Sequence, residues 1–114
     1  MRIYDNSPSL ALVRDASAQY IGGTLAQYPD RYAATSPLTY VSRLSPPTIL
    51  LLGADDRIVP SEQVGILDAA MTRVGAPVET YLLPATDHGF DVNWGGFATQ
   101  FARTKIARFL ERHP

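Results

Sequence analysis

The distribution of apolar residues predicts alternating strands and helices in the second half of the chain. Residues 48–52 form an apolar run without alternation, which is typical of a parallel strand covered on both faces. Residues 78–83 form a second segment of strand length, closed by Pro84. Between the two, Ser61 is suited to cap the N-terminus of a helix. The apolar positions of that helix are Val64, Leu67, Ala70, Met71 and Val74.

Glycine and proline mark where this helix ends and the second strand begins. Gly75 stands where a left-handed residue commonly terminates a helix, and Pro77 follows it. A last helix is expected over residues 96–111, with six apolar residues on one side: Phe97, Phe101, Ala102, Ile106, Phe109 and Leu110. Strand, helix, strand and helix in this order predict a right-handed βαβ crossover with a covering helix. The fold class is therefore α/β.

The first half of the chain is expected to be helical. Ser7-Pro8 opens a helix over residues 9–20, and Gly22-Gly23 ends it. Its apolar face comprises Leu10, Leu12, Val13 and Ala16. Residues 24–35 are expected to form one or two short helical turns. We expect a single domain over 1–114, with a helical, lid-like region at 1–47 and a βαβα unit at 48–114.

A sheet of only two parallel strands has two open edges, and the apolar strand at 48–52 requires neighbours on both sides. We therefore expect the chain not to act as a monomer. The sheet would be completed by a homo-oligomer or by a partner chain.

Composition restricts the classes of function. The 114 residues carry a formal charge of −1 with 46% hydrophobic content, which argues against disorder and against nucleic-acid or membrane partners. There are no cysteines, which excludes disulfides and a thiolate nucleophile. No signal-peptide core or membrane span is visible, so a cytoplasmic location is expected.

Polar residues follow both predicted strands. Asp55 and Asp56 come after the first strand, and Asp87 and His88 come after the second. Functional groups of parallel sheets collect at the carboxyl ends of strands, so a carboxylate and the imidazole could meet there. A buried aspartate that accepts from Nδ1–H makes histidine a competent general base. The alternative is structural: Asp56 stabilising backbone amides of its own loop, and His88 a partly buried histidine.

Five short motifs, in order, resemble the C-terminal third of α/β-hydrolase-fold serine hydrolases. They are Ser36-Pro37 with Tyr40-Val41, Pro46-Pro47-Thr48-Ile49-Leu50, the segment Gly-Ala-Asp-Asp-Arg-Ile-Val-Pro at 53–60, Val74-Gly75 with Val78-Glu79, and Asp87-His88-Gly89-Phe90. The resemblance is to the esterase, lipase and prolyl-oligopeptidase-like branch. It implies Asp56, three residues before Val-Pro, as the catalytic acid. It also implies His88 as the catalytic base.

The family's nucleophile motif, Gly-x-Ser-x-Gly, occurs nowhere in the 114 residues. The first hypothesis is that the chain is the acid-and-histidine portion of a serine carboxylic-ester or peptide hydrolase, acting on a small ester, with the serine supplied by a complementing hydrolase half. The second is a catalytically inactive, truncated relative acting as a self-associating or binding module. A fragment of a longer gene product is the third. None implies a cofactor, and His88 with His113 lacks metal-ligand spacing.

Overall fold

The computed structural model describes residues 8–114, with side chains from residue 11 onward. The chain forms two compact units, of which the first ends at Tyr40 and the second begins at Val41. The expected single domain, with its division after residue 47, stays a prediction. Ser7, expected to open the first helix, lies outside the described residues.

The first unit contains helix α1 (Pro8–Ile21), helix α2 (Pro29–Thr35) and a 3₁₀ helix, η1 (Pro37–Tyr40). The helices predicted over 9–20 and within 24–35 are confirmed. The expected apolar face of the first is not: Leu12 is 75% exposed and Ala16 is exposed. The physical reason is a lack of apolar partners, because every buried apolar residue among the described ones belongs to the second unit.

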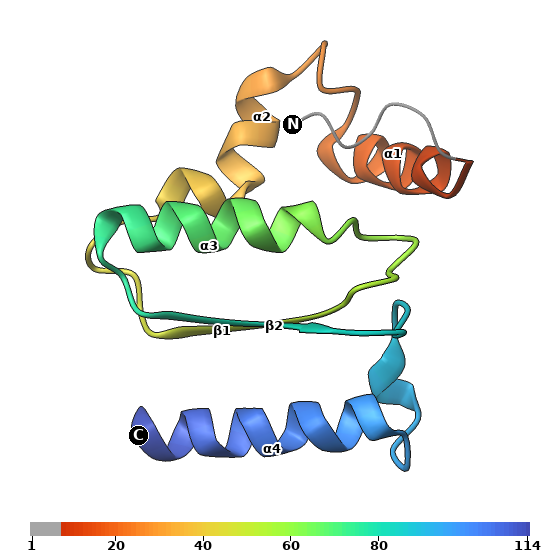
Figure 1. The fold of residues 1–114 in the computed structure, drawn as a ribbon. Helices are drawn as coiled ribbons and strands as arrows, with labels where there is room; N and C mark the ends of the chain where they lie inside the picture. The colour runs from red at the N-terminus through yellow and green to blue at the C-terminus, as the bar shows by residue number, and fades with distance from the viewer. Residues whose placement is uncertain (1–7) are drawn as a thin grey trace. The chain divides into compact units, whose positions relative to one another are not determined.

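The second unit is an α/β arrangement. Its elements are β1 (Thr48–Gly53), α3 (Glu62–Val74), β2 (Val78–Leu83), the 3₁₀ helix η2 (Phe90–Val92) and α4 (Phe97–Arg112). The two strands pair in parallel, in a register that runs from Thr48 opposite Val78 to Gly53 opposite Leu83. Helices α3 and α4 lie on opposite faces of this sheet (Figure 1). The predicted strand-helix-strand-helix order and the parallel pairing are confirmed.

Helix α3 illustrates what local signals do and do not determine. Gly75 adopts the expected left-handed conformation, with φ 74° and ψ 22°, and its N–H donates to the carbonyl of Thr72. Ser61 directly precedes the helix as expected, but its side chain makes no capping hydrogen bond. Its backbone already has helical angles, whereas a capping side chain needs an extended backbone to reach the free N–H groups.

Helix α4 buries a narrower stripe than its sequence suggests. Ala102 and Phe109 are buried, whereas Phe97 is 83% exposed and Leu110 is 59% exposed. With 3.6 residues per turn, Leu110 lies to one side of the stripe that faces the sheet, and Phe97 lies on the opposite side of the helix. The expectation that all six apolar residues share one buried side is therefore wrong.

The apolar strand β1 is less covered than expected. All five of its residues before Gly53 are only half-buried, although their sequence predicts a strand covered on both faces. On β2, Leu82 is 49% exposed. Both observations follow from a two-stranded sheet whose edges have no further strand in the described part of the chain.

Candidate active site

The two loops that follow the strands are held together by their backbones. The N–H of Ala54 donates to the carbonyl of Leu83 at 2.8 Å, and the N–H of Asp55 donates to the carbonyl of Thr86 at 3.0 Å. Gly53 is essential to this approach, because a Cβ at that position would overlap the carbonyl oxygen of Thr86. Sequence reasoning missed this role; the only signal was a glycine at the end of an apolar strand.

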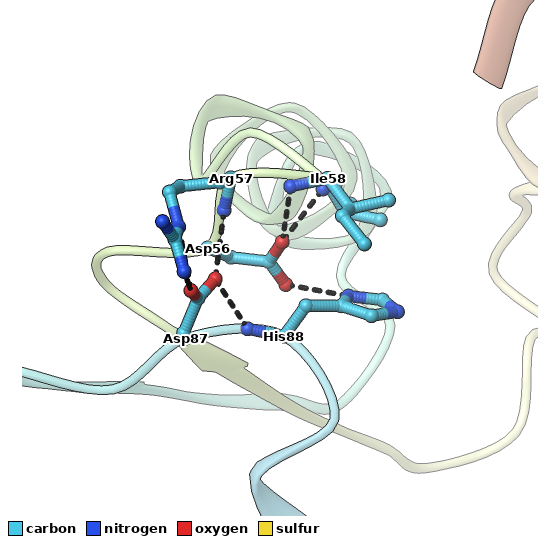
Figure 2. A network of polar contacts seen from close by, with 6 residues as sticks. Asp56, Arg57, Ile58, Asp87 and His88 are labelled. Carbon is cyan, nitrogen blue, oxygen red and sulfur yellow. Dashed lines mark hydrogen bonds and ion pairs between the residues drawn. The ribbon is translucent and has the colours of Figure 1, made fainter. Parts of the chain in front are cut away.

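Asp56 and His88 meet at this junction, 32 positions apart in the chain. The Nδ1 of His88 lies 2.9 Å from Oδ2 of Asp56 (Figure 2). The other oxygen, Oδ1, accepts the backbone N–H groups of Ile58 at 2.8 Å and Val59 at 2.7 Å. The Asp56 side chain is only 1% exposed, so its carboxylate is held in one orientation by its own loop and directed at the imidazole.

The electrostatic setting keeps Asp56 ionised. Burial by itself raises the pKa of the Asp56 carboxyl, but the hydrogen bonds from Val59 N–H, His88 and Ile58 N–H outweigh it, and the net pKa lies below the ordinary value. An ionised carboxylate only accepts hydrogen bonds. We therefore assign the proton to Nδ1 of His88, which leaves the lone pair of a neutral imidazole on Nε2.

The imidazole of His88 is accessible on its other side. Its side chain is 46% exposed, and Nε2 has no hydrogen-bond partner among residues 8–114. Figure 2 shows this nitrogen directed away from Asp56. His88 and Asp56 line a pocket of about 390 Å³, whose apolar lining includes Leu51, Leu52 and Ile106. A base with a free nitrogen beside an apolar pocket is a suitable arrangement for general acid–base chemistry.

A second ion pair lies beside the first. Oδ2 of Asp87 accepts Nε of Arg57 at 2.6 Å and also contacts the terminal guanidinium nitrogen. Oδ1 of Asp87 accepts the backbone N–H of His88 at 2.7 Å and that of Arg57 at 3.1 Å. The Arg57 guanidinium and these N–H groups lower the pKa of the Asp87 carboxyl to about 2. Sequence reasoning named Asp87 only as part of a motif and gave Arg57 no role.

The other candidate residues do not contact the Asp56–His88 pair. Asp55 is exposed, which agrees with the choice of Asp56 rather than Asp55 as the candidate acid. No serine in the described part of the chain hydrogen-bonds to His88. Within residues 8–114, no group of three or more histidine, aspartate or glutamate side chains could hold a metal ion. The same residues contain no helix long and apolar enough to cross a bilayer.

Comparison with known proteins identifies the family of the chain. Residues 2–71, more than half of the chain, match the BD-FAE family model. The chain belongs to the BD-FAE family. The match includes Asp56 but ends before His88, so the family assignment and the Asp–His geometry are separate observations. The BD-FAE chain is α/β-hydrolase-like, and the resemblance predicted from its motifs is confirmed.

Curated relatives of this BD-FAE chain are named as esterases and a peptidase. Esterase LipQ of Mycobacterium tuberculosis is 38% identical over 65 residues, covering 56% of this chain and 15% of LipQ. Esterase LipC of the same organism is 31% identical over 90 residues, covering 78% of this chain and 22% of LipC. The uncharacterized peptidase YtmA of Bacillus subtilis is 27% identical over 78 residues, covering 68% of this chain and 30% of YtmA. The chain thus spans 15–30% of the length of these relatives.

Solved structures confirm a partial α/β-hydrolase fold. The butyrate-bound esterase 2 of Thermogutta terrifontis superposes with a TM-score of 0.69 at 24% identity, over 97% of this chain and 38% of that one. The sarin-phosphonylated form of the same esterase gives a TM-score of 0.63 at 31% identity, over 68% of this chain and 29% of the esterase. The BD-FAE chain is therefore an esterase-like member of the α/β-hydrolase family.

Proposed function

We propose that this chain supplies the acid and the base of a serine hydrolase that cleaves small carboxylic esters, with peptides as the alternative substrate class. Asp56 orients the imidazole of His88, and His88 transfers the proton. The observation that carries the proposal is the 2.9 Å contact between a buried carboxylate and a partly exposed imidazole that belongs to a pocket-lining residue. The names of LipQ and LipC favour esters over peptides.

In this reaction, Nε2 of His88 takes the proton from a serine hydroxyl as the serine oxygen attacks the ester carbonyl. The imidazolium is stabilised by the ionised Asp56. His88 then donates the proton to the leaving alcohol, and the reverse sequence with water releases the acid. The nucleophile motif Gly-x-Ser-x-Gly is absent from the 114 residues, so the serine and the oxyanion hole come from another polypeptide or from further sequence of the same protein.

A chimera tests the proposal directly. This chain replaces the segment of Thermogutta terrifontis esterase 2 with which it superposes, and hydrolysis of p-nitrophenyl butyrate is measured. We expect turnover that is blocked by a serine-reactive phosphonate. Asp56→Asn should reduce kcat by about ten-thousandfold, because the base loses its orientation, and His88→Ala by about a millionfold, because the base is removed.

Asp55→Asn is the matched control, since Asp55 is the adjacent aspartate and is exposed. We expect this variant to stay within about twofold of the parent chimera, because it leaves the Asp56–His88 contact intact. A folded chimera that hydrolyses the ester equally well with His88→Ala would contradict the assignment. Equal losses from Asp55→Asn and Asp56→Asn would contradict the selection of Asp56.

A second candidate, compatible with the first, is association through the sheet. It is supported by the half-buried apolar residues of β1, which have no second neighbouring strand among the described residues. A second copy of this chain or a complementing hydrolase half would cover that edge. Light scattering should give a mass above the monomer for the purified chain, and Leu50→Glu should lower it. Leu44→Glu, at a position 93% exposed, should not. A cooperatively melting monomer would contradict self-association.

A further inference from the structure

The Asp87 side chain hydrogen-bonds to the backbone of both loops beside the Asp–His pair. It directly precedes His88, and its partner Arg57 directly follows Asp56. Through Oδ1 it accepts the N–H of His88 at 2.7 Å and the N–H of Arg57 at 3.1 Å (Figure 2). A single carboxylate oxygen therefore connects the residue next to the acid with the base itself.

These two bonds differ from the ion pair that Asp87 makes with the Arg57 side chain. The Arg57 side chain is 82% exposed and that of Asp87 is 39% exposed, and ion pairs at such sites contribute little by themselves. The bonds to backbone N–H groups fix the separation of two chain segments that are 30 positions apart. Since Asp56 is oriented by its own loop, the position of the loop that carries His88 determines whether the imidazole reaches Oδ2.

We propose that Asp87 is a positioning residue: its backbone hydrogen bonds, rather than its ion pair, hold His88 within hydrogen-bond distance of Asp56. The inference rests on the proposed function, because it concerns the same pair. It assigns no chemical step to Asp87, whose carboxylate has no contact with the His88 ring. Its effect is on the orientation and tautomer of the base, which determine whether Nε2 is free to accept a proton.

The test reads the tautomer of His88 and needs no hydrolysis. Nitrogen-15 NMR of the histidine-labelled full chain, at about pH 8.5 where an ordinary histidine is neutral, distinguishes a proton on Nδ1 from one on Nε2. The only other histidine, His113, is assigned with His113→Gln. Three variants are compared with the unmodified chain: Asp87→Ala, Asp87→Asn and Glu79→Ala.

The variants separate the two kinds of contact. In Asp87→Asn the amide oxygen can still accept both N–H groups while the ion pair is lost; Asp87→Ala loses both. Glu79→Ala is the matched control, because Glu79 pairs with Arg112 at 2.5 Å and accepts the Tyr81 hydroxyl, without a backbone contact. We expect Asp87→Ala to lower the ratio of Nδ1-protonated to Nε2-protonated His88 by about tenfold or more. Asp87→Asn and Glu79→Ala should leave the ratio within about twofold.

A folded Asp87→Ala chain with an unchanged ratio would overturn the inference while leaving the proposed function standing. If Asp87→Asn lowers the ratio of Nδ1-protonated to Nε2-protonated His88 as much as Asp87→Ala does, the effect belongs to the ion pair. That result would also overturn the inference. If the unmodified chain already carries the proton on Nε2, the Asp56–His88 pair is not formed, and the proposed function fails as well.

Hydrogen exchange of the unmodified chain gives a second reading, which holds even if Asp87→Ala does not fold. The backbone N–H groups of Arg57 and His88 should exchange about tenfold or more slowly than unbonded loop amides. Exchange at the rate of unbonded amides would overturn the proposal.

Discussion

The close contact between the two loops can be tested by adding a single methyl group. In Gly53→Ala, the new Cβ would overlap the carbonyl oxygen of Thr86, and it would lie 2.7 Å from the Thr86 carbonyl carbon and 3.0 Å from the Asp87 carbonyl oxygen. These atoms belong to the backbone that leads into His88, so no side-chain rotation can relieve the overlap. The loop that carries His88 has to move away from β1.

The expected loss of stability has two parts. Inserting a methyl group into a space filled by backbone atoms costs about 1–3 kcal/mol. Moving the loop also breaks the bond from Asp55 N–H to Thr86 C=O, which contributes about 0.5–1.5 kcal/mol. Together these predict a decrease of about 1.5–4.5 kcal/mol in the free energy of unfolding, equivalent to a drop in Tm of roughly 6–18 °C for a chain of this size.

Urea and thermal unfolding followed by circular dichroism measure this change. Gly65→Ala is the matched control: Gly65 lies in α3, and its added Cβ meets nothing within 4 Å. Alanine favours a helix over glycine by about 0.5–1 kcal/mol, so this variant should be more stable than the parent chain. If Gly53→Ala proves as stable as the parent, or shifts in the same direction as Gly65→Ala, the contact between Gly53 and the His88 loop is refuted.

Three further predictions concern the second unit. Ala85 has a positive φ of 51°, so Ala85→Gly should raise the free energy of unfolding by about 0.5–1 kcal/mol, and a decrease in urea midpoint would contradict this. The folded pKa of Asp87, about 2, lies below the unfolded value of about 3.9, so its stabilisation is present above about pH 4 and is lost as the pH falls through about 2. The difference in Tm between the parent chain and Asp87→Asn should therefore narrow over that range; a constant difference would refute the linkage. Thr80 donates to Asp68 at 2.5 Å, and Thr80→Val should cost about 0.5–1.5 kcal/mol in urea unfolding, whereas no cost would show that α3 is not held to β2 by this bond.

Much of the fold could be predicted because its signals are local. The apolar run of β1, the helical spacing in α3 and the left-handed Gly75 each depend on a few consecutive residues, and the observed elements agree with them closely. Burial was less predictable. Phe97 and Leu110 are as apolar as Phe109, but only the packing of α4 against the sheet determines which of them is covered.

The candidate site was predictable to the extent that it follows from strand order. Parallel neighbouring strands end at the same edge of the sheet, so the loops that carry Asp56 and His88 had to be neighbours once β1 and β2 were paired. The motif resemblance then selected Asp56 over Asp55. The observed contact at 2.9 Å agrees with that selection, and the catalytic role of the pair stays a proposal.

The sequence by itself determined which residues form strands and helices, the α/β class, and the two loops in which acid and base candidates stand, because these depend on periodicity and chain order. Only the tertiary structure decided that Gly53 has to be small, that Asp56 is buried beneath its own loop amides, and that Asp87 connects Arg57 to His88. The reason is physical: these properties depend on distances between segments some 30 positions apart, which no local pattern of residues specifies.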